Sequence, residues 1–414
     1  MYEPRIIDSI LDELMPGLPA ILLEGAKSVG KTATASRRAR SAFHLDDPAD
    51  IALLRADPAN LDRAPAPVLV DEWQRMPELW DRVRRAVDAG ATPGQYLLTG
   101  SAVPVGAPVH SGAGRIDPIR MRPMSLAERM PGHITVSLAA LLRGGRPPLD
   151  GETAMVAGGY ASEILRSGFP GLRNTEGRML RARLDGYLEN VVRHEFPEQG
   201  AHVRRPETLR RWLRAYAAAT STTASYATVL RAAAGEREPP PAKTSTIAYR
   251  DVLTQLWLID PLDGWQPTGS ELSRVAKAPK HQLADPALAA RLLDLTDVDF
   301  TAGGRGVRLF GQLFEHLVAL GVQTYAGAAE ARIGHLRTQG GEHEVDMIVE
   351  RGEHVVAIEV KAARTIDDHD VRHLSWLAGL LGDRLVDSIV VTTGPRAYRR
   401  ADGIGVVPAA LLGP

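Results

Sequence analysis

The chain has 414 residues, more than one ordinary hydrophobic core holds, and this length predicts about three domains. A net charge of −1 gives no overall attraction for nucleic acid, so any such contact would rest on local patches. The absence of cysteine, of long apolar runs and of a signal-like N-terminus excludes disulfides and thiolate metal sites, indicates no membrane partner, and predicts a cytoplasmic protein.

The first elements in chain order predict a nucleotide site. Apolar spacing predicts a helix over residues 5–14, and the run 20–23 predicts a buried strand. The residues that follow fit the phosphate-loop pattern G-x-x-x-x-G-K-[ST], and no Gly or Pro interrupts the next helix. The alternative is a glycine-containing turn that binds no ligand. The loop consists of Gly25, Ala26, Lys27, Ser28, Val29, Gly30, Lys31 and Thr32.

Each residue type in this loop suits phosphate binding. Gly25 and Gly30 allow the tight turn that points successive N–H groups and the helix N-terminus at the phosphates. Lys31 supplies a positive charge, and Thr32 supplies a hydroxyl ligand for Mg²⁺. The loop alone therefore predicts a purine triphosphate or a similar phosphate ligand.

The next strands add carboxylates and hydroxyls. A short strand and turn at 43–48 and strands at 67–72 and 95–101 alternate with helices at 49–56 and 78–88. This alternation predicts a parallel sheet, whose ligands bind at the carboxyl ends of the strands. There Asp71 would hold Mg²⁺ and Glu72 would orient the attacking water. Thr99 or Ser101 either contacts the γ-phosphate or the water, or caps a turn.

An arginine finger is predicted after these strands. Arg115 is the best-placed candidate to stabilise charge on the transferring phosphoryl group, acting across a subunit boundary in a homo-oligomer. Arg120 and Arg122 are rival candidates, and the alternative for Arg115 is a solvated loop position.

These stretches resemble a prokaryotic family of AAA+ type ATPases that carry a C-terminal domain of unknown function. The resemblance implies that the nucleotide is ATP. Ala26-Lys27-Ser28 stands where the family usually has Pro-Arg-Gln, but these positions vary. Besides the loop, the matching stretches are Asp47-Pro48, 70–79 (VDEWQRMPEL), 98–101 (LTGS), Gly114-Arg115, 123–128 (PMSLAE), 167–170 (SGFP), Pro279-Lys280 and Asp285.

The middle of the chain is predicted to be mostly helical. By analogy with AAA+ proteins, residues 131–200 would form a lid over the nucleotide. Helical patterns over 207–234, a capped helix from 244 and a strand at 257–262 follow the order of a winged helix, as in the resembled family. A basic cluster either contacts nucleic acid or forms a solvated helix face. This cluster contains Arg204, Arg205, Arg210, Arg211 and Arg214.

The C-terminal part predicts a second cluster of charged residues. Residues 344–349 and 356–361 form two strands of a hairpin, in which Glu359 and Lys361 share one face and Asp346 lies on the neighbouring strand. Glu315 would reach this cluster from a helix over 311–318. The order Asp346, then Glu359-x-Lys361, resembles the PD-(D/E)xK nuclease core.

Two interpretations of this cluster remain open. In the first, Asp346 and Glu359 hold Mg²⁺ for cleavage of DNA or RNA, and Lys361 either orients the attacking water or neutralises the charge that develops on the phosphorane. In the second, the cluster is a charged face of an inactive nuclease-like scaffold used for binding. His369 and His373, spaced i and i+4 on an expected helix, are a weaker metal candidate without a third ligand.

Together these patterns predict an α/β protein of four parts. Residues 1–130 form a P-loop AAA+ parallel-sheet domain, 131–200 a helical lid, 201–300 a winged-helix segment, and 301–414 a restriction-endonuclease-like α/β domain. The expected function is Mg²⁺-dependent ATP hydrolysis coupled to a nuclease-like domain that acts on nucleic acid. The alternative is a nucleotide-gated interaction protein whose C-terminal domain cuts nothing.

Overall fold

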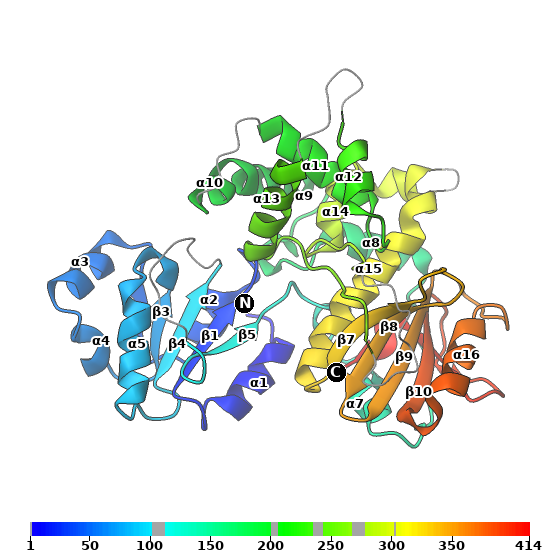
Figure 1. The fold of residues 1–414 in the computed structure, drawn as a ribbon, viewed down its shortest axis with the longest axis horizontal. Helices are drawn as coiled ribbons and strands as arrows, with labels where there is room; N and C mark the ends of the chain where they lie inside the picture. Colours follow the sequence, from blue (N-terminus) through cyan, green and yellow to red (C-terminus); the bar gives the residue numbers. More distant parts are fainter. Residues whose placement is uncertain (1, 102–111, 200–205, 235–242, 267–277, 302–303) are drawn as a thin grey trace.

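The computed structural model describes residues 2–101, 112–199, 206–234, 243–266, 278–301 and 304–414. Figure 1 shows one sheet at each end of the molecule, with helices between and above them. Arg204 and Arg205 of the predicted basic cluster lie outside the described residues.

The N-terminal sheet has five parallel strands in the order β2-β3-β4-β1-β5. Because β4 lies between β1 and β3, the segments that follow these three strands meet at one edge of the sheet. The predicted parallel sheet is therefore confirmed. The strands are β1 (Ala20–Glu24), β2 (Ser41–His44), β3 (Val68–Asp71), β4 (Tyr96–Gly100) and β5 (Asp117–Arg120).

Helices cover both faces of this sheet, which explains why its three inner strands, β3, β4 and β1, are mostly apolar and buried. One face packs against α3 (Pro48–Ala56), α4 (Asn60–Arg63) and α5 (Glu78–Asp88). The other face packs against α1 (Ile6–Leu14) and α2 (Lys31–Ser36), the helix that follows the loop.

The middle of the chain is helical, as expected. At the end of α9 a π-helical turn spans Val191–Glu195. The winged-helix arrangement stays a prediction. The helices are α6 (Leu126–Arg129), α8 (Ala157–Arg166), α9 (Gly177–Asn190), α10 (Phe196–Glu198), α11 (Pro206–Ala218), α12 (Tyr226–Ala232), α13 (Lys243–Gln255) and α14 (Pro286–Leu292).

The strand predicted over 257–262 is wrong. This segment forms only isolated bridges, from Ile259 to Leu283 and from Leu262 to Lys280. Pro261 has no N–H to donate to a continuous ladder, and Trp257 has a φ of 57°, outside the extended region.

The C-terminal sheet has six strands in the order β11-β12-β10-β9-β8-β7. β8 and β9 are antiparallel, with Met347 opposite Ile358, and they form the predicted hairpin. One face packs against α15 (Arg305–Ala328) and the other against α16 (Arg372–Leu381). The strands are β7 (Arg332–Arg337), β8 (Glu344–Arg351), β9 (His354–Lys361), β10 (Leu385–Thr392), β11 (Tyr398–Arg399) and β12 (Gly405–Pro408).

Part of the segment predicted as a lid packs against the C-terminal sheet. β6 (Val136–Ser137) pairs with β13 (Leu412–Gly413). α7 (Leu138–Leu142) follows β6, and the carbonyl of Leu142 lies 2.8 Å from Nδ1 of His354. The chain therefore crosses from the first sheet to the second soon after residue 130.

One continuous apolar core joins the two sheets. It includes Leu23 of β1, Leu184 of α9, Phe314 of α15 and Ile358 of β9. The two ends of the molecule are thus linked by close packing, which transmits displacement better than a flexible linker does. Among the described residues, no helix has the length and apolar character required to cross a membrane.

Candidate functional sites

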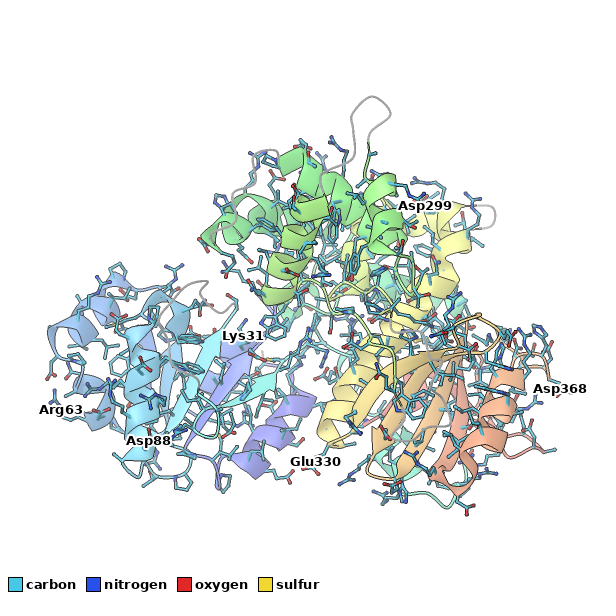
Figure 2. The ribbon with its side chains drawn as sticks, viewed as in Figure 1. Lys31, Arg63, Asp88, Asp299, Glu330 and Asp368 are labelled. Atoms are coloured by element: carbon cyan, nitrogen blue, oxygen red, sulfur yellow. The ribbon has the colours of Figure 1, made fainter. Side chains whose placement is uncertain are left out.

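The phosphate loop has a backbone that only glycine allows at its first position. Gly25 has a φ of 150°, and a Cβ there would lie 2.1 Å from the carbonyl oxygen of Met121. Gly30 has a φ of 105° and forms the N-cap of α2. Figure 2 shows Lys31 at the edge of the N-terminal sheet nearest the middle helices.

Lys31 is buried with only 5% of its surface exposed. Its ammonium donates to the carbonyl oxygens of Gly25, at 2.8 Å, and Ala26, at 3.0 Å. Burial lowers the pKa of Lys31 to about 8, although Glu72 and Asp71 oppose this shift. The ammonium is therefore held by neutral dipoles, and no described carboxylate lies within ion-pair distance.

Asp71 is the centre of a network of hydroxyl groups at the end of β3. The hydroxyl of Thr32 donates to Asp71 Oδ1 at 2.8 Å, and the hydroxyl of Thr99 donates to the same oxygen. His44 Nδ1 lies 3.1 Å from Asp71 Oδ2. Hydroxyl and carboxylate oxygens are ligands that Mg²⁺ prefers, so this donor set fits that ion.

Glu72 begins a cleft beside the loop. Its φ of 56° turns the chain sharply after β3, and its N–H donates to Thr99 Oγ1 at 3.3 Å. The side-chain amide of Gln74 donates to Glu72 and also to Ser101 Oγ, at 3.4 Å. The cleft has a volume of about 310 Å³. Its lining includes Lys27, Glu72, Gln74, Arg75, Ser101, Glu195 and Gln199.

A middle helix contacts the loop at this cleft. The carboxylate of Glu195 lies 3.4 Å from Lys27 Nζ, and Tyr187 OH donates to the Lys27 carbonyl at 3.4 Å. Burial raises the pKa of Glu195. These contacts place part of the predicted lid directly against the loop.

A second cavity, of about 420 Å³, adjoins the loop at Gly30. Met121, Met124 and Pro170 give it apolar walls. Arg5 also lines it, and donates to the Val29 carbonyl at 2.8 Å. Sequence reasoning missed this cavity, although the stretches 123–128 and 167–170, which contribute to it, belong to the family resemblance.

The three candidate arginines have different surroundings. Arg115 is partly exposed and pairs with Asp88 at 2.7 Å. Arg120 and Arg122 instead pair with the buried Asp260, at 3.0 and 2.7 Å. Within the described chain these contacts put Arg120 and Arg122 at the junction with the middle segment, while a role for Arg115 across a subunit boundary stays a prediction.

The second candidate site is the charged cluster of the C-terminal domain. Lys361 Nζ lies 2.8 Å from Glu359 Oε1, and the N–H of Val360 donates to Asp346 Oδ2 at 2.9 Å. The hairpin thus brings Asp346, Glu359 and Lys361 together, as the period of the strands predicts. Glu315 reaches the cluster from α15, because it contacts the same lysine as Asp346.

That lysine is Lys280, which sequence reasoning did not place in the cluster. Only 1% of its surface is exposed. Its ammonium lies 2.7 Å from Asp346, 2.9 Å from Glu315 and 3.3 Å from Glu344. One signal was available, because Lys280 is one of only six lysines and belongs to the resemblance.

The cluster is a tightly coupled group of charges. Burial, together with the charge of Asp346, raises the pKa of Glu315 to about 8 and that of Glu359 to about 8. Burial also opposes ionisation of Asp346, but Lys280 keeps the pKa of Asp346 below its usual value. The three carboxylates around Lys280 in turn raise the pKa of Lys280.

The expected helical pair of histidines is not formed. His369 lies in a turn before α16, which begins at Arg372. The side chain of Asp367 accepts from the N–H groups of His369, at 2.9 Å, and Asp370, at 3.1 Å, and such local bonds compete with helix formation. His373 instead lies 3.4 Å from His343.

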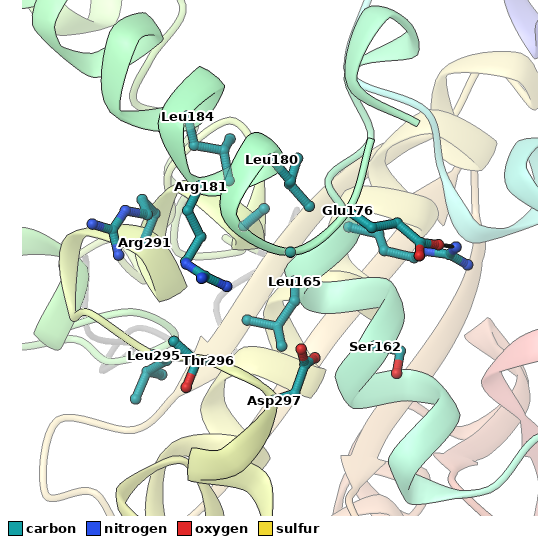
Figure 3. A pocket seen from close by; sticks show the side chains of 13 residues that line it. Ser162, Leu165, Glu176, Leu180, Arg181, Leu184, Arg291, Leu295, Thr296 and Asp297 are labelled. Atoms are coloured by element: carbon teal, nitrogen blue, oxygen red, sulfur yellow. Dashed lines mark hydrogen bonds and ion pairs between the residues drawn. The ribbon is translucent and has the colours of Figure 1, made fainter. Parts of the chain in front are cut away.

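A third cavity, of about 570 Å³, lies away from both sites, among α8, α9 and α14. Figure 3 shows its leucine side chains, Leu165, Leu180, Leu184 and Leu295, together with Arg181. None of the predicted site residues lines it.

Three family models match consecutive parts of the chain. An AAA domain model matches residues 18–130, and models of domains of unknown function, DUF8612 and DUF4143, match residues 158–299 and 310–412. Combined with the parallel sheet and the loop, the first match makes the N-terminal domain a P-loop domain of the AAA type, a class of ATP-binding domain.

Relatives and a solved structure extend this comparison. The chain is 25% identical over 420 residues to the uncharacterized proteins Rv2008c of Mycobacterium tuberculosis and Mb2031c of Mycobacterium bovis, covering 99% of this chain and 84% of each relative. A Walker-type ATPase of Pyrococcus abyssi is 16% identical, with a TM-score of 0.39, over 70% of this chain and 96% of that chain.

Proposed function

We propose that this protein binds ATP with Mg²⁺ at the phosphate loop and hydrolyses it. The observation that carries this proposal is the state of Lys31, a buried ammonium held by two carbonyl groups. Anionic phosphate oxygens are stronger acceptors than carbonyl groups, because both partners are then charged. A triphosphate in the loop would therefore satisfy a charge that the described part of the chain leaves without an anion.

The neighbouring residues suit the remaining roles. Thr32 and Asp71 would hold Mg²⁺, which when bound would shield the phosphate charge. Glu72 would orient the attacking water in the cleft of about 310 Å³, and Thr99 would keep Asp71 in position. Ser101 lines the same cleft and is the alternative contact for the water or the γ-phosphate.

The cavity of about 420 Å³ beside Gly30 is the proposed site for the base. A purine has flat apolar faces, and Met121, Met124 and Pro170 offer apolar surface next to the loop. This arrangement separates the base from the cleft in which water would attack.

The nucleotide state would be communicated through the contacts of β5. The N–H of Met121 donates at 2.7 Å to the carbonyl oxygen of Glu24, the residue directly before the loop. Arg120 and Arg122, on either side of Met121, pair with Asp260. Residue 262, two positions further on, pairs with Lys280 through backbone bonds of 2.8 and 3.0 Å. A displacement of the loop thus has a short physical route to the C-terminal cluster.

Two variants test the proposal by ATP binding and phosphate release. Lys31→Ala should reduce binding and turnover by about 100-fold or more, since a buried charge for the phosphates is lost. Glu72→Gln should bind ATP and hydrolyse it slowly. Arg63→Ala, an exposed change in the same domain, is the control. Unchanged hydrolysis in Lys31→Ala would refute the proposal, and equal loss of binding in Glu72→Gln would refute the role of that residue.

Metal-dependent cleavage of DNA or RNA by the C-terminal domain is a competing function, which the position of Lys280 among the carboxylates opposes. The gathering of Asp346, Glu359 and Lys361 supports it. Nucleic-acid binding by the basic cluster has less support, because Arg210 pairs with Glu189, and Arg214 with Asp294. The alternative, in which ATP gates a C-terminal domain that binds a partner without cutting, agrees better with the buried lysine in the cluster.

A further inference from the structure

Lys280 enters the C-terminal cluster from outside the sheet that carries it. The residue follows the Ala278-Pro279 segment, and backbone hydrogen bonds with Leu262 fix its position. Its side chain lies between Glu315 of α15 and Asp346 of β8. Helix, strand and connecting segment thus converge on one ammonium group.

The carboxylate oxygens of the cluster are largely committed to protein donors. Asp346 accepts from Lys280 through Oδ1 and from the N–H of Val360 through Oδ2. Glu315 Oε1 accepts from Lys280, and Glu359 Oε1 accepts from Lys361. Among the described residues, the buried Oε2 of Glu359 has no hydrogen-bond partner.

This arrangement does not fit a divalent cation. Mg²⁺ demands about six oxygen ligands in octahedral geometry, and the ammonium of Lys280 already lies between Asp346 Oδ1 and Glu315 Oε1. An ion bound by Asp346 and Glu359 would also have to approach the ammonium of Lys280 and meet charge repulsion in a site of low dielectric constant. The cluster has an internal cation in place of a bound metal.

We propose that the Lys280 ammonium is the resident cation of this carboxylate cluster and closes the C-terminal centre to divalent metal ions. The centre is then a fixed charged scaffold, and cleavage of phosphodiesters by a carboxylate-bound metal does not occur there. The proposal does not rest on ATP hydrolysis, because it concerns residues of the other site.

The test counts Mn²⁺ ions bound to the full chain, by electron paramagnetic resonance of the free ion. All variants also carry Asp71→Asn, which removes the carboxylate proposed to hold the metal ion at the nucleotide site. With Lys280 intact, this Asp71→Asn background should bind the same number of Mn²⁺ ions with and without a further Glu359→Gln change. Adding Lys280→Ala should create one Mn²⁺ site per chain that is absent with Lys280 intact. A further Glu359→Gln change should abolish this site.

Two results would overturn the proposal. One is Mn²⁺ binding with Lys280 intact that disappears in Asp346→Asn or Glu359→Gln. The other is a Lys280→Ala chain with an unchanged circular dichroism spectrum that gains no site. Should Lys280→Ala fail to fold, the dependence of Mn²⁺ binding on Glu359 with Lys280 intact decides by itself. Lys280→Arg is the matched control, because it keeps the positive charge and should still exclude Mn²⁺.

Discussion

Among the residues whose burial the structure describes, two lysines are buried, and their surroundings are opposite. Lys31 is 5% exposed and faces two carbonyl oxygens, and its pKa falls to about 8. Lys280 is 1% exposed and faces three carboxylates, which raise its pKa. Burial disfavours the charged form of both side chains, so the different partners account for the opposite pKa shifts of the two lysines.

The difference shows how the same residue type prepares one site for a ligand and closes another. A buried ammonium with neutral partners retains unused attraction for an anion, whereas a buried ammonium among carboxylates has already gained that attraction within the protein. The first site is suited to phosphate, and the second holds a helix, a strand and a connecting segment together.

The largest expected effect is on stability. Lys280→Met leaves Asp346, Glu315 and Glu344 facing one another without a cation, and breaking such a buried ion pair costs about 3–5 kcal/mol. The loss of stability is measured by urea unfolding, with hydrogen exchange of β8 and β9 as the readout. Lys361→Met is the matched control, and its loss should be smaller because Lys361 is partly exposed. Equal losses of stability in the two variants would show that Lys280 stabilises the cluster no more than Lys361 does.

The second prediction concerns the pH dependence of ATP binding. Because the pKa of Lys31 is lowered to about 8, its ammonium is charged below that pH and progressively neutral above it. ATP affinity should therefore be flat near pH 7–8 and fall by up to about tenfold per pH unit above it. Calorimetry near pH 9, in buffers of different ionisation enthalpy, should reveal proton uptake on binding. No uptake would contradict the lowered pKa.

Glu359 gives a third prediction, for stability against pH. Its pKa is raised from 4.5 to about 8, so between these values the folded protein holds a proton that the unfolded chain has lost. Stability should therefore fall as pH rises through this window, by up to about 1.4 kcal/mol per unit for one proton. Glu359→Gln, which cannot titrate, should flatten this slope in unfolding curves at pH 5–8. An unchanged slope of stability against pH in Glu359→Gln would show that other groups cause the pH dependence.

The smallest expected effect concerns communication between the sites. Asp260→Asn weakens the pairs with Arg120 and Arg122 while keeping the shape of the side chain. It should reduce the influence of ATP on hydrogen exchange of β8 and β9 by about 0.5–2 kcal/mol, without changing ATP affinity to the same extent. Asp294→Asn, whose side chain is half-exposed, is a control. An ATP effect of full size in Asp260→Asn would exclude this route.

Much of the fold follows from local pattern. The apolar runs that end at Glu24, Asp71 and Gly100 are strands because both sheet faces are covered, and parallel strands bring their carboxyl ends together. The period of two in β9 likewise brings Glu359 and Lys361 together. These parts of both sites were therefore predictable from the sequence.

The remaining features depend on contacts between distant segments. Lys280 lies 35 residues from Glu315 and 66 from Asp346 in a segment without a strand period, so no local pattern indicates the meeting. The bridges at 257–262 replace a strand because Pro261 cannot donate, and the turn before α16 forms because Asp367 competes for backbone N–H groups. Such competition is decided by tertiary packing.

The most direct test of the account is a parallel assay of both sites in one preparation. ATP hydrolysis and cleavage of single- and double-stranded DNA and RNA are measured with Mg²⁺ or Mn²⁺, with and without ATP, for wild type, Lys31→Ala and Lys361→Ala. The account predicts ATP hydrolysis that is lost in Lys31→Ala, and no cleavage by any of the three proteins. Cleavage by wild type that disappears in Lys361→Ala would contradict it.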